Sequence, residues 1–266
     1  MITDSHCHLA SARFNEGEAA EIISRADAAG VKRMVTLATC LEDIEANLEL
    51  ARDARVKAAI GIHPCDVHNA PDDAVARLAT FAGDARVCAI GETGLDYFHP
   101  APEGWDEMNF RKRQRDFLTS HFELARDAGL NVVIHTRDKE GSRSFEDALE
   151  IYSCFSGKVR AVFHCFISDW ELGEKVIAMG GLVSFGGVST FKNAHAAKDA
   201  AARCPAGSFM LETDSPYLAP EPVRGKRNEP AFSMHIAERI AILREETLRE
   251  LAAHTESAVD GFFRWP

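Results

Sequence analysis

Histidine and carboxylate side chains recur in this sequence at the ends of short apolar runs, and their types suit metal binding. They are His6, His8, His63, Glu92, His135, His164 and Asp214. Imidazole nitrogen and carboxylate oxygen together suit Zn²⁺, Mn²⁺ or Fe²⁺, and a carboxylate such as Glu92 can bridge two neighbouring ions. All of these residues except His63 are candidate ligands, and a two-metal hydrolytic site is the chemistry that they could support.

One pair, His6 and His8, is separated by a single residue. Side chains two apart on a strand point to the same face, so this pair could share one ion while Cys7 faces away. A lone histidine is more often a core or surface residue than a ligand. These residues therefore form a site only if the fold brings them together.

The apolar runs predict buried strands joined by helices. Eight β-rich runs alternate with amphipathic stretches, at residues 2–8, 33–38, 56–63, 87–93, 131–135, 160–164, 181–185 and 208–213. Most of them are too continuously apolar for a sheet with one wet face. This alternation predicts an α/β protein with parallel strands, and eight strands predict a TIM (β/α)₈ barrel.

The stretches between the strands have helical spacing, as in Ile22, Ile23 and Ala26, and Gly30 stands where a helix should stop. We expect one domain over residues 1–266, with a C-terminal helix at about 245–263 that covers the outside of the barrel. An open doubly wound sheet is the alternative, but its dinucleotide-binding version requires a Gly-x-Gly-x-x-Gly turn, which this sequence lacks.

In a barrel the candidate residues would converge, because each stands at the C-terminal end of a predicted strand. Barrel active sites are assembled at that face. Several ligand types at several strand ends make a shared site a better explanation than a set of unrelated core histidines. The sequence thus predicts one pocket that contains all of them.

Composition narrows the choice of function. Hydrophobic residues make up 46% and charged residues 27% of the chain, and the seven cysteines form no Cys-x-x-Cys pair, so neither a disulfide framework nor a structural zinc site is indicated. Without a leader-like or membrane-spanning segment, we expect a cytoplasmic protein. The formal net charge of −11 opposes broad attraction to polyphosphate, so any contact with nucleic acid must be local.

A series of short motifs then runs in order along nearly the whole chain. They are Asp4-Ser5-His6-Cys7-His8, Gly61-Ile62-His63-Pro64, Gly91-Glu92-Thr93-Gly94-Leu95-Asp96-Tyr97, Ile134-His135-Thr136-Arg137-Asp138, His164-Cys165-Phe166 and Glu212-Thr213-Asp214-Ser215-Pro216. With these motifs the chain resembles the TatD family of metal-dependent deoxyribonucleases.

The resemblance implies an amidohydrolase-like barrel in which His6, His8, Glu92 and Asp214 hold one ion, while Glu92, His135 and His164 hold the second. It also implies hydrolysis of DNA phosphodiester bonds by a 3′-5′ exonuclease that uses two divalent ions, Mg²⁺, Mn²⁺ or Zn²⁺. The expected partner is DNA, as a single strand or a 3′ end, with no membrane and no stable protein partner.

Individual roles follow from position and chemistry. Asp214 is the predicted general base beside the bridging Glu92, with pure ligation as its alternative. His63 could donate a hydrogen bond to the scissile phosphate, or be a structural histidine at a strand end. Arg137 and Arg227 are candidates to hold phosphates, although basic residues of this kind often form only a solvated face.

Polar and aromatic neighbours of these residues have two interpretations each. Asp4 and Glu212 share strand faces with His6 and Asp214, so they could orient ligands. Asp4 could instead close the barrel, and Glu212 could bind an additional ion. The loop after the fourth run carries Tyr97, Phe98, His99 and Trp105, which could stack on bases or pack as a lid.

Two other functions remain open at the level of sequence. The same metals could serve an esterase or amidase, such as a D-aminoacyl-tRNA deacylase, or the chain could be a catalytically silent binding module. A phosphotriesterase-like site is less attractive, because that group bridges its metals with a modified lysine where this chain has Glu92.

Overall fold

Eight strands follow one another around the structure in chain order, and every neighbouring pair is parallel. They are β1 (Ile2–Cys7), β2 (Val31–Leu37), β3 (Val56–Ile60), β4 (Val87–Asp96), β5 (Val132–Arg137), β6 (Ala161–Phe163), β7 (Leu182–Phe185) and β8 (Phe209–Leu211). The computed structural model describes residues 1–265. Each predicted run contains or overlaps one of these strands, which confirms the TIM barrel.

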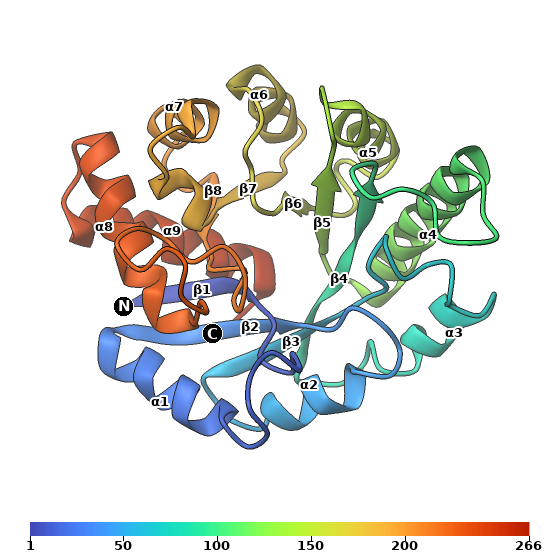
Figure 1. Ribbon diagram of the computed structural model, residues 1–266, viewed down its shortest axis with the longest axis horizontal. Coiled ribbons are helices and arrows are strands. Elements are labelled where there is room, and N and C mark those ends of the chain that lie inside the picture. The colour runs from blue at the N-terminus through green and yellow to red at the C-terminus, as the bar shows by residue number, and fades with distance from the viewer. Residues whose placement is uncertain (266) are drawn as a thin grey trace.

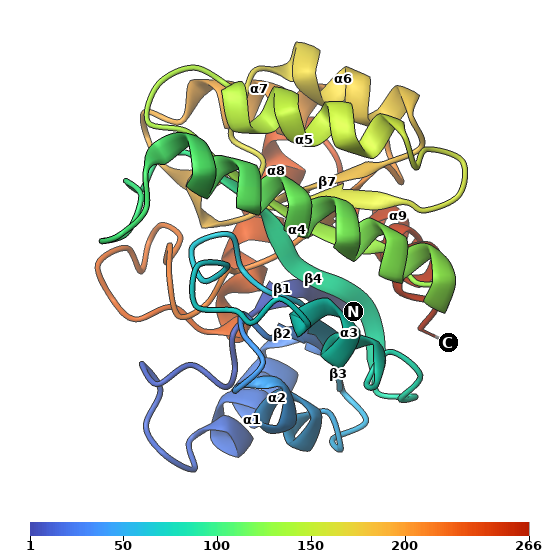
Figure 2. The same ribbon diagram turned by 90° about the vertical axis from the view of Figure 1, so that its right-hand side faces the viewer.

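Helices follow the strands along the chain and, apart from the C-terminal helix, pack around their outside (Figure 1). They are α1 (Ala19–Ala29), α2 (Ile44–Leu50), α3 (Ala74–Ala79), α4 (Glu107–Ala128), α5 (Arg143–Ser153), α6 (Trp170–Ala178), α7 (His195–Arg203), α8 (Ser233–Arg244) and α9 (Leu248–Phe263), with the short η1 (Gly187–Thr190) and η2 (Pro230–Phe232). The long α4 lies across β4 (Figure 2). Within residues 1–265 no helix combines the length and apolarity that crossing a membrane requires.

The strands carry an inner and an outer layer of buried side chains. The inner layer joins Val35, Leu37, Ala59, Ala89, Val133, Val162, Leu182 and Met210. Side chains between them, such as Phe163, belong to the larger cluster that packs the strands against the helices. Because side chains two apart share a face, the inner row of β5 continues from Val133 to His135, and that of β8 leads from Met210 to Asp214. The candidate ligands therefore lie on the inner face of the barrel, at the C-terminal ends of its strands.

The barrel closes between β1 and the residues that follow β8. Asp214 N donates to His6 O at 2.9 Å. Thr213 donates to the carboxylate of Asp4 from its backbone N at 2.8 Å and from its hydroxyl at 2.5 Å. This seam places Asp214 beside His6, so the closure of the fold also assembles the site. Of the two roles considered for Asp4, its contacts support closure.

The C-terminal helix α9 covers the bottom of the barrel, whereas the sequence analysis expected it to cover the outside. Its Val259 and Phe262 join the inner layer of side chains. Phe262 O accepts a hydrogen bond at 2.6 Å from Asn131, which directly precedes β5. The apolar face of α9 therefore closes the N-terminal end of the barrel and leaves the opposite end open.

Gly94 on β4 lies where the backbone of β5 approaches closely. Its φ is +148°, and a Cβ at this position would overlap the carbonyl oxygen of His135. We expect Gly94→Ala to displace β5 and to lower the free energy of unfolding by about 3 kcal/mol or more. Urea unfolding measures this loss.

Gly83→Ala is the matched control for that experiment, because nothing lies within 4 Å of a Cβ built there. Its free energy of unfolding should change by less than about 1 kcal/mol. Equal stability of the two variants would contradict the close approach inferred at Gly94.

Candidate metal centre

The predicted ligands and His63 meet at the C-terminal end of the barrel. A cavity of about 820 Å³ is lined there by His8, His63, Glu92, His135, His164 and Asp214. His6 lies beneath them and is fully buried. The structure thus brings together every histidine and acid that the sequence selected as a ligand.

One group of ligand atoms lies between β1, β4 and the end of β8. His6 Nε2 is 3.3 Å from His8 Nε2 and 3.4 Å from Glu92 Oε2. Asp214 Oδ1 is 3.7 Å from His6 Nε2 and 3.4 Å from His8 Nε2. Ligand atoms about 2.1 Å from a tetrahedral ion lie about 3.4 Å apart. This first group therefore has the dimensions of a four-coordinate metal site.

A second group lies on the other side of Glu92. Glu92 Oε1 is 3.0 Å from His135 Nδ1 and 2.9 Å from His164 Nε2, and these two nitrogens are 3.1 Å apart. Ligands at right angles and about 2.1 Å from an ion lie about 3.0 Å apart, as on one face of an octahedron. An ion held here would keep positions free for water or substrate.

The pairing of ring nitrogens supports cation binding. His6 and His8 approach through their Nε2 atoms, and His135 and His164 approach through Nδ1 and Nε2. Metal binding requires the deprotonated ring nitrogens, and each of these pairs would then offer lone pairs to a cation. The residues present therefore fit one divalent ion in each group.

The two carboxylates of the groups are ionised. Burial acts to raise the pKa of Glu92, but the charge of His164 and the hydrogen bond with His135 outweigh it and hold this pKa well below its usual range. Burial is likewise outweighed at Asp214, where the hydrogen bond to His8 and the nearby histidine charges lower the pKa. The two carboxylates therefore carry negative charge at the centre of the cavity.

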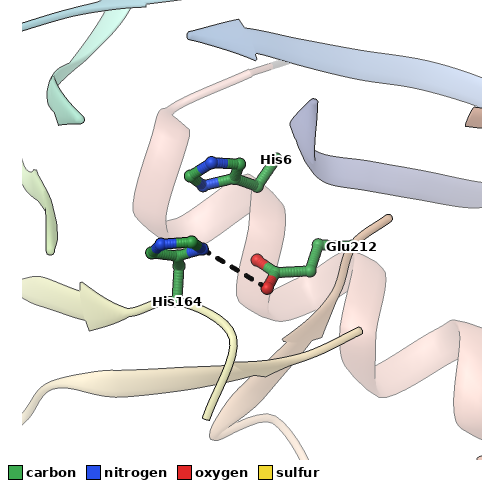
Figure 3. Close-up of side chains that lie close together, drawn as sticks. All are labelled: His6, His164 and Glu212. Carbon is green, nitrogen blue, oxygen red and sulfur yellow. Dashed lines mark ion pairs between the residues drawn. The ribbon is translucent and has the colours of Figure 1, made fainter. Parts of the chain in front are cut away.

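Glu212 supports His164 from inside the barrel (Figure 3). Its Oε1 lies 3.6 Å from His164 Nδ1 and accepts a hydrogen bond from Cys165 N at 2.6 Å. Ser184 donates to the other oxygen at 2.5 Å. The ring of His6 stacks on that of His164, with centroids 4.0 Å apart. A carboxylate behind a ligating histidine fixes the direction of its ring, so Glu212 has the position of a supporting residue.

Asp96 supports His135 in the same way, a role that sequence reasoning missed. Its Oδ2 lies 3.2 Å from His135 Nε2, which leaves Nδ1 of that ring facing Glu92. Asp96 stands four residues after Glu92 on β4, so both carboxylates share one face of the strand. That spacing is the feature from which Asp96 could have been found.

His63 lines the cavity but belongs to neither ligand group. Its Nε2 is 3.6 Å from Glu92 Oε1, and its Nδ1 accepts a hydrogen bond from Cys65 N at 3.2 Å. Burial lowers the pKa of His63 to about 3, so the ring is neutral at pH 7. The bond to Nδ1 then places the single ring proton on Nε2. His63 therefore presents a hydrogen-bond donor beside Glu92.

Of the two arginines expected at the site, Arg137 lines the cavity and Arg227 does not. The Arg137 guanidinium lies 4.1 Å from the centre of the Phe98 ring. Arg227 instead pairs with the carboxylate of Glu18 and donates to Arg13 O at 3.2 Å. Its charge is therefore used in holding the loop before α1.

Arg13 is a cation at the cavity that sequence reasoning missed. Arg13 follows β1 and Arg137 ends β5, so the two line the cavity from opposite sides of the eight-stranded barrel. The Arg13 guanidinium lies 4.8 Å from the centre of the Tyr217 ring. No motif marks Arg13, but it stands in the loop after β1, and loops at this end of a barrel supply site residues.

His121 on α4 anchors the end of β3 from behind the cavity. Its Nε2 accepts from Ile62 N at 3.1 Å, and its Nδ1 donates to Phe117 O at 2.7 Å. Burial lowers the pKa of His121 from 6.5 to about 4. Between these two pH values the unfolded chain binds a proton that the folded chain does not, so stability falls as the pH decreases.

We expect His121→Gln to weaken this pH dependence. Above pH 6.5 the histidine is neutral in both states and contributes no pH dependence, whereas by pH 5 its protonation in the unfolded chain costs about 2 kcal/mol. Urea unfolding at pH 7 and pH 5, in metal-free buffer, should show a smaller difference for the variant. Identical differences in the two proteins would contradict the neutral, buried histidine.

Comparisons with known proteins identify relatives of this chain that are metal-dependent hydrolases. A family model described as TatD related DNase matches residues 3–264. The chain is 35% identical over 270 residues to the uncharacterized metal-dependent hydrolase YcfH of Escherichia coli K12, covering 99% of this chain and 95% of that protein. It is 33% identical over 266 residues to the uncharacterized metal-dependent hydrolase YabD of Bacillus subtilis, covering 99% of each.

Solved structures give the same result for the fold. The crystal structure of YjjV, a TatD homologue from Escherichia coli K12, superposes with a TM-score of 0.89 at 26% identity and covers 100% of this chain and 98% of that one. Together with the match to the family model over nearly all residues, this shows that the chain is a metal-dependent hydrolase that belongs to the TatD-related DNase family.

Proposed function

We propose that this protein hydrolyses phosphodiester bonds of DNA with two divalent ions, Mg²⁺, Mn²⁺ or Zn²⁺, and removes nucleotides from the 3′ end. The observation that carries the proposal is the position of Glu92, whose two oxygens each face a separate group of ring nitrogens. A carboxylate between two ligand groups is the arrangement used to hold paired ions around a phosphoryl group. The polarity of digestion follows from the family resemblance.

When bound, the ions would neutralise charge on the phosphoryl oxygens and lower the pKa of a coordinated water. Asp214 would accept the proton of the attacking water. Its side chain is 16% exposed, whereas that of Glu92 is 3% exposed, so Asp214 is the carboxylate of the first group with better access to the cavity. Glu92 would hold the two ligand groups at a fixed separation.

His63 would donate a hydrogen bond from Nε2 to an oxygen of the scissile phosphate. The tautomer supports this role, because Cys65 N occupies Nδ1 and leaves the proton on the atom that faces the cavity. Neutral hydrogen-bond donors aimed at developing charge contribute to catalysis without a proton transfer of their own.

The cavity mouth supports a strand of DNA as the substrate. Arg13 and Arg137 line it, and the aromatic rings beneath their guanidinium groups, Tyr217 and Phe98, are 40% and 41% exposed. Cations can bind phosphates while exposed rings stack on bases. Such a local contact is compatible with the net charge of −11.

The test is digestion of end-labelled DNA by metal-loaded protein. Single-stranded and double-stranded oligonucleotides with a 5′ label should give ladders shortened from the 3′ end with Mg²⁺, Mn²⁺ or Zn²⁺, and a phosphorothioate linkage at the 3′ end should block them. The Asp214→Asn protein should give no ladder. Intact DNA with every ion, beside cleavage of a D-aminoacyl-tRNA ester, would overturn the nuclease assignment.

Replacing His63 tests the proposed donor. We expect His63→Ala to lower kcat by roughly 10²–10³-fold, the usual loss when one such donor is removed, while the metal content is unchanged. Steady-state kinetics on a short oligonucleotide and elemental analysis of the purified protein measure the two quantities. A fall in metal content together with kcat would show instead that His63 is needed to hold an ion.

A further inference from the structure

A third set of side chains with metal-binding chemistry lies at the rim of the cavity, outside the two ligand groups. Cys65 follows β3, Asp96 ends β4, and His99 lies in the loop between β4 and α4. Cys65 Sγ is 3.6 Å from His99 Nδ1, which is 3.0 Å from Asp96 Oδ2. One ligand atom from each residue lies within 4.8 Å of the others.

The spacing of the Cys65 sulfur and the His99 nitrogen suits a tetrahedral ion. Zinc lies about 2.3 Å from sulfur and about 2.0–2.1 Å from nitrogen, which places the two ligand atoms about 3.6 Å apart at a tetrahedral angle. The measured separation of Cys65 Sγ and His99 Nδ1 has this value. Sulfur, nitrogen and oxygen together are donors that zinc accepts at a single site.

The backbone holds these ligands in place. Asp96 Oδ1 accepts hydrogen bonds from Phe98 N at 3.0 Å and from His99 N at 2.9 Å, so the turn after β4 is fixed by the carboxylate itself. The backbone N of Cys65 donates a hydrogen bond to Nδ1 of the His63 ring. The Asp96 side chain is 1% exposed and that of His99 is 48% exposed. The cluster is therefore supported on its inner side and open to solvent on the other.

We propose that Cys65, Asp96 and His99 form an additional binding site for a thiophilic divalent cation such as Zn²⁺, separate from the two hydrolytic ions. Binding forms a bond between the cation and the Cys65 sulfur and releases the thiol proton to solvent. The fourth position faces solvent or the cavity, where a water molecule completes the tetrahedron. Because a thiolate selects Zn²⁺ or Co²⁺ over Mg²⁺ and Mn²⁺, this site differs in metal preference from the nitrogen and oxygen groups.

The additional site is coupled to the second ligand group through one atom. Asp96 Oδ2 is shared between His99 Nδ1 and His135 Nε2, which lie 3.0 Å and 3.2 Å away. A cation that draws on this oxygen competes with the hydrogen bond that orients His135. The inference does not depend on which bond the enzyme hydrolyses.

Cobalt binding tests the proposal without an activity measurement. Co²⁺ bound to a thiolate has a near-ultraviolet charge-transfer band, and neither hydrolytic ligand group contains a cysteine. Titration of the metal-free protein with Co²⁺ should produce this band with the intensity of one cobalt–thiolate bond. Cys65→Ser should abolish it, while Cys154→Ser, which changes an exposed cysteine, should retain it.

Cys165→Ser is the second control, because Cys165 also lines the cavity and follows His164. The band should survive this change. Absence of the band from the unaltered protein, or its loss in Cys165→Ser and survival in Cys65→Ser, would overturn the proposal.

Zinc stoichiometry provides an independent measurement through another ligand. We expect His99→Asn to reduce the affinity for Zn²⁺ at this site at least about 10-fold. At the lowest free concentration that saturates the unaltered protein, the variant should therefore bind at least about half an equivalent less. Equal numbers of tightly bound Zn²⁺ ions in the two folded proteins would overturn the assignment.

Discussion

Replacing Glu92 with glutamine is expected to lower the rate of hydrolysis by at least about 10³-fold and to reduce the number of tightly bound metal ions. The reason lies in the geometry of one side chain. Oε2 lies 3.4 Å from His6 Nε2, and Oε1 lies 2.9 Å from His164 Nε2, so each oxygen belongs to a different ligand group. No other side chain described within residues 1–265 lies in both groups.

A glutamine has the size of Glu92 but only one ligand atom. Its amide oxygen can serve one group, and its NH₂ then points donor hydrogens toward the other group, where a cation should lie. The substitution also removes the negative charge at the centre of five histidines. The variant should therefore fold and lose metal, and higher metal concentration should restore little of its rate.

Elemental analysis after gel filtration gives the metal content, and initial rates over a range of Mn²⁺ concentrations give the activity. Glu103→Gln is the matched control, because Glu103 is an exposed glutamate in the loop after the same strand. Its metal content and rate should equal those of the unaltered protein. Full metal content and a normal rate in Glu92→Gln would show that this residue does not bridge two ions.

The strands and the ligand set could be predicted because both depend on local patterns. Apolar runs of strand length alternate with helical stretches, and a barrel places the ends of such strands at one rim. Because side chains alternate along a strand, His135 lies on the same inner face as Val133, and Asp214 lies on the same inner face as Met210. Position on a strand was enough to predict that these side chains meet in one cavity.

Side chains whose role depends on loop geometry could not be predicted in this way. Arg227 was expected at the phosphate, but it does not line the cavity and pairs with Glu18. Arg13 reaches the cavity from the loop after β1, where no periodic pattern exists. Cys65 and His99 are 34 residues apart and meet only because their loops follow neighbouring strands.

The position of α9 shows a different limit. Its apolar spacing predicts a helix that buries one face, but the sequence does not say which surface receives that face. In the structure Val259 and Phe262 fill the bottom of the barrel, and Glu256 pairs with the buried Arg33 at 2.7 Å. An open barrel end is an apolar surface that only the assembled fold reveals.

Asp214→Asn is expected to reduce kcat by roughly 10²–10⁴-fold even when both metal sites are saturated, the usual contribution of a general base. Asp214 has a φ of +57°, a left-handed conformation that asparagine also tolerates, so the backbone should not change. Alanine would add backbone strain to the loss of the carboxylate. The asparagine variant therefore separates the chemistry of this residue from the folding of the seam.

Ligation and proton transfer by Asp214 make different predictions for the dependence of rate on metal concentration. Loss of a ligand alone weakens binding at the first group, and the rate recovers fully when metal is in excess. Loss of the base leaves kcat low at every concentration, because asparagine cannot accept the proton of water at neutral pH. Asp169→Asn, an exposed aspartate after β6, should match the unaltered protein throughout. Full recovery of kcat in Asp214→Asn at saturating Mn²⁺ would restrict Asp214 to ligation and leave the base to be sought among the other groups that line the cavity.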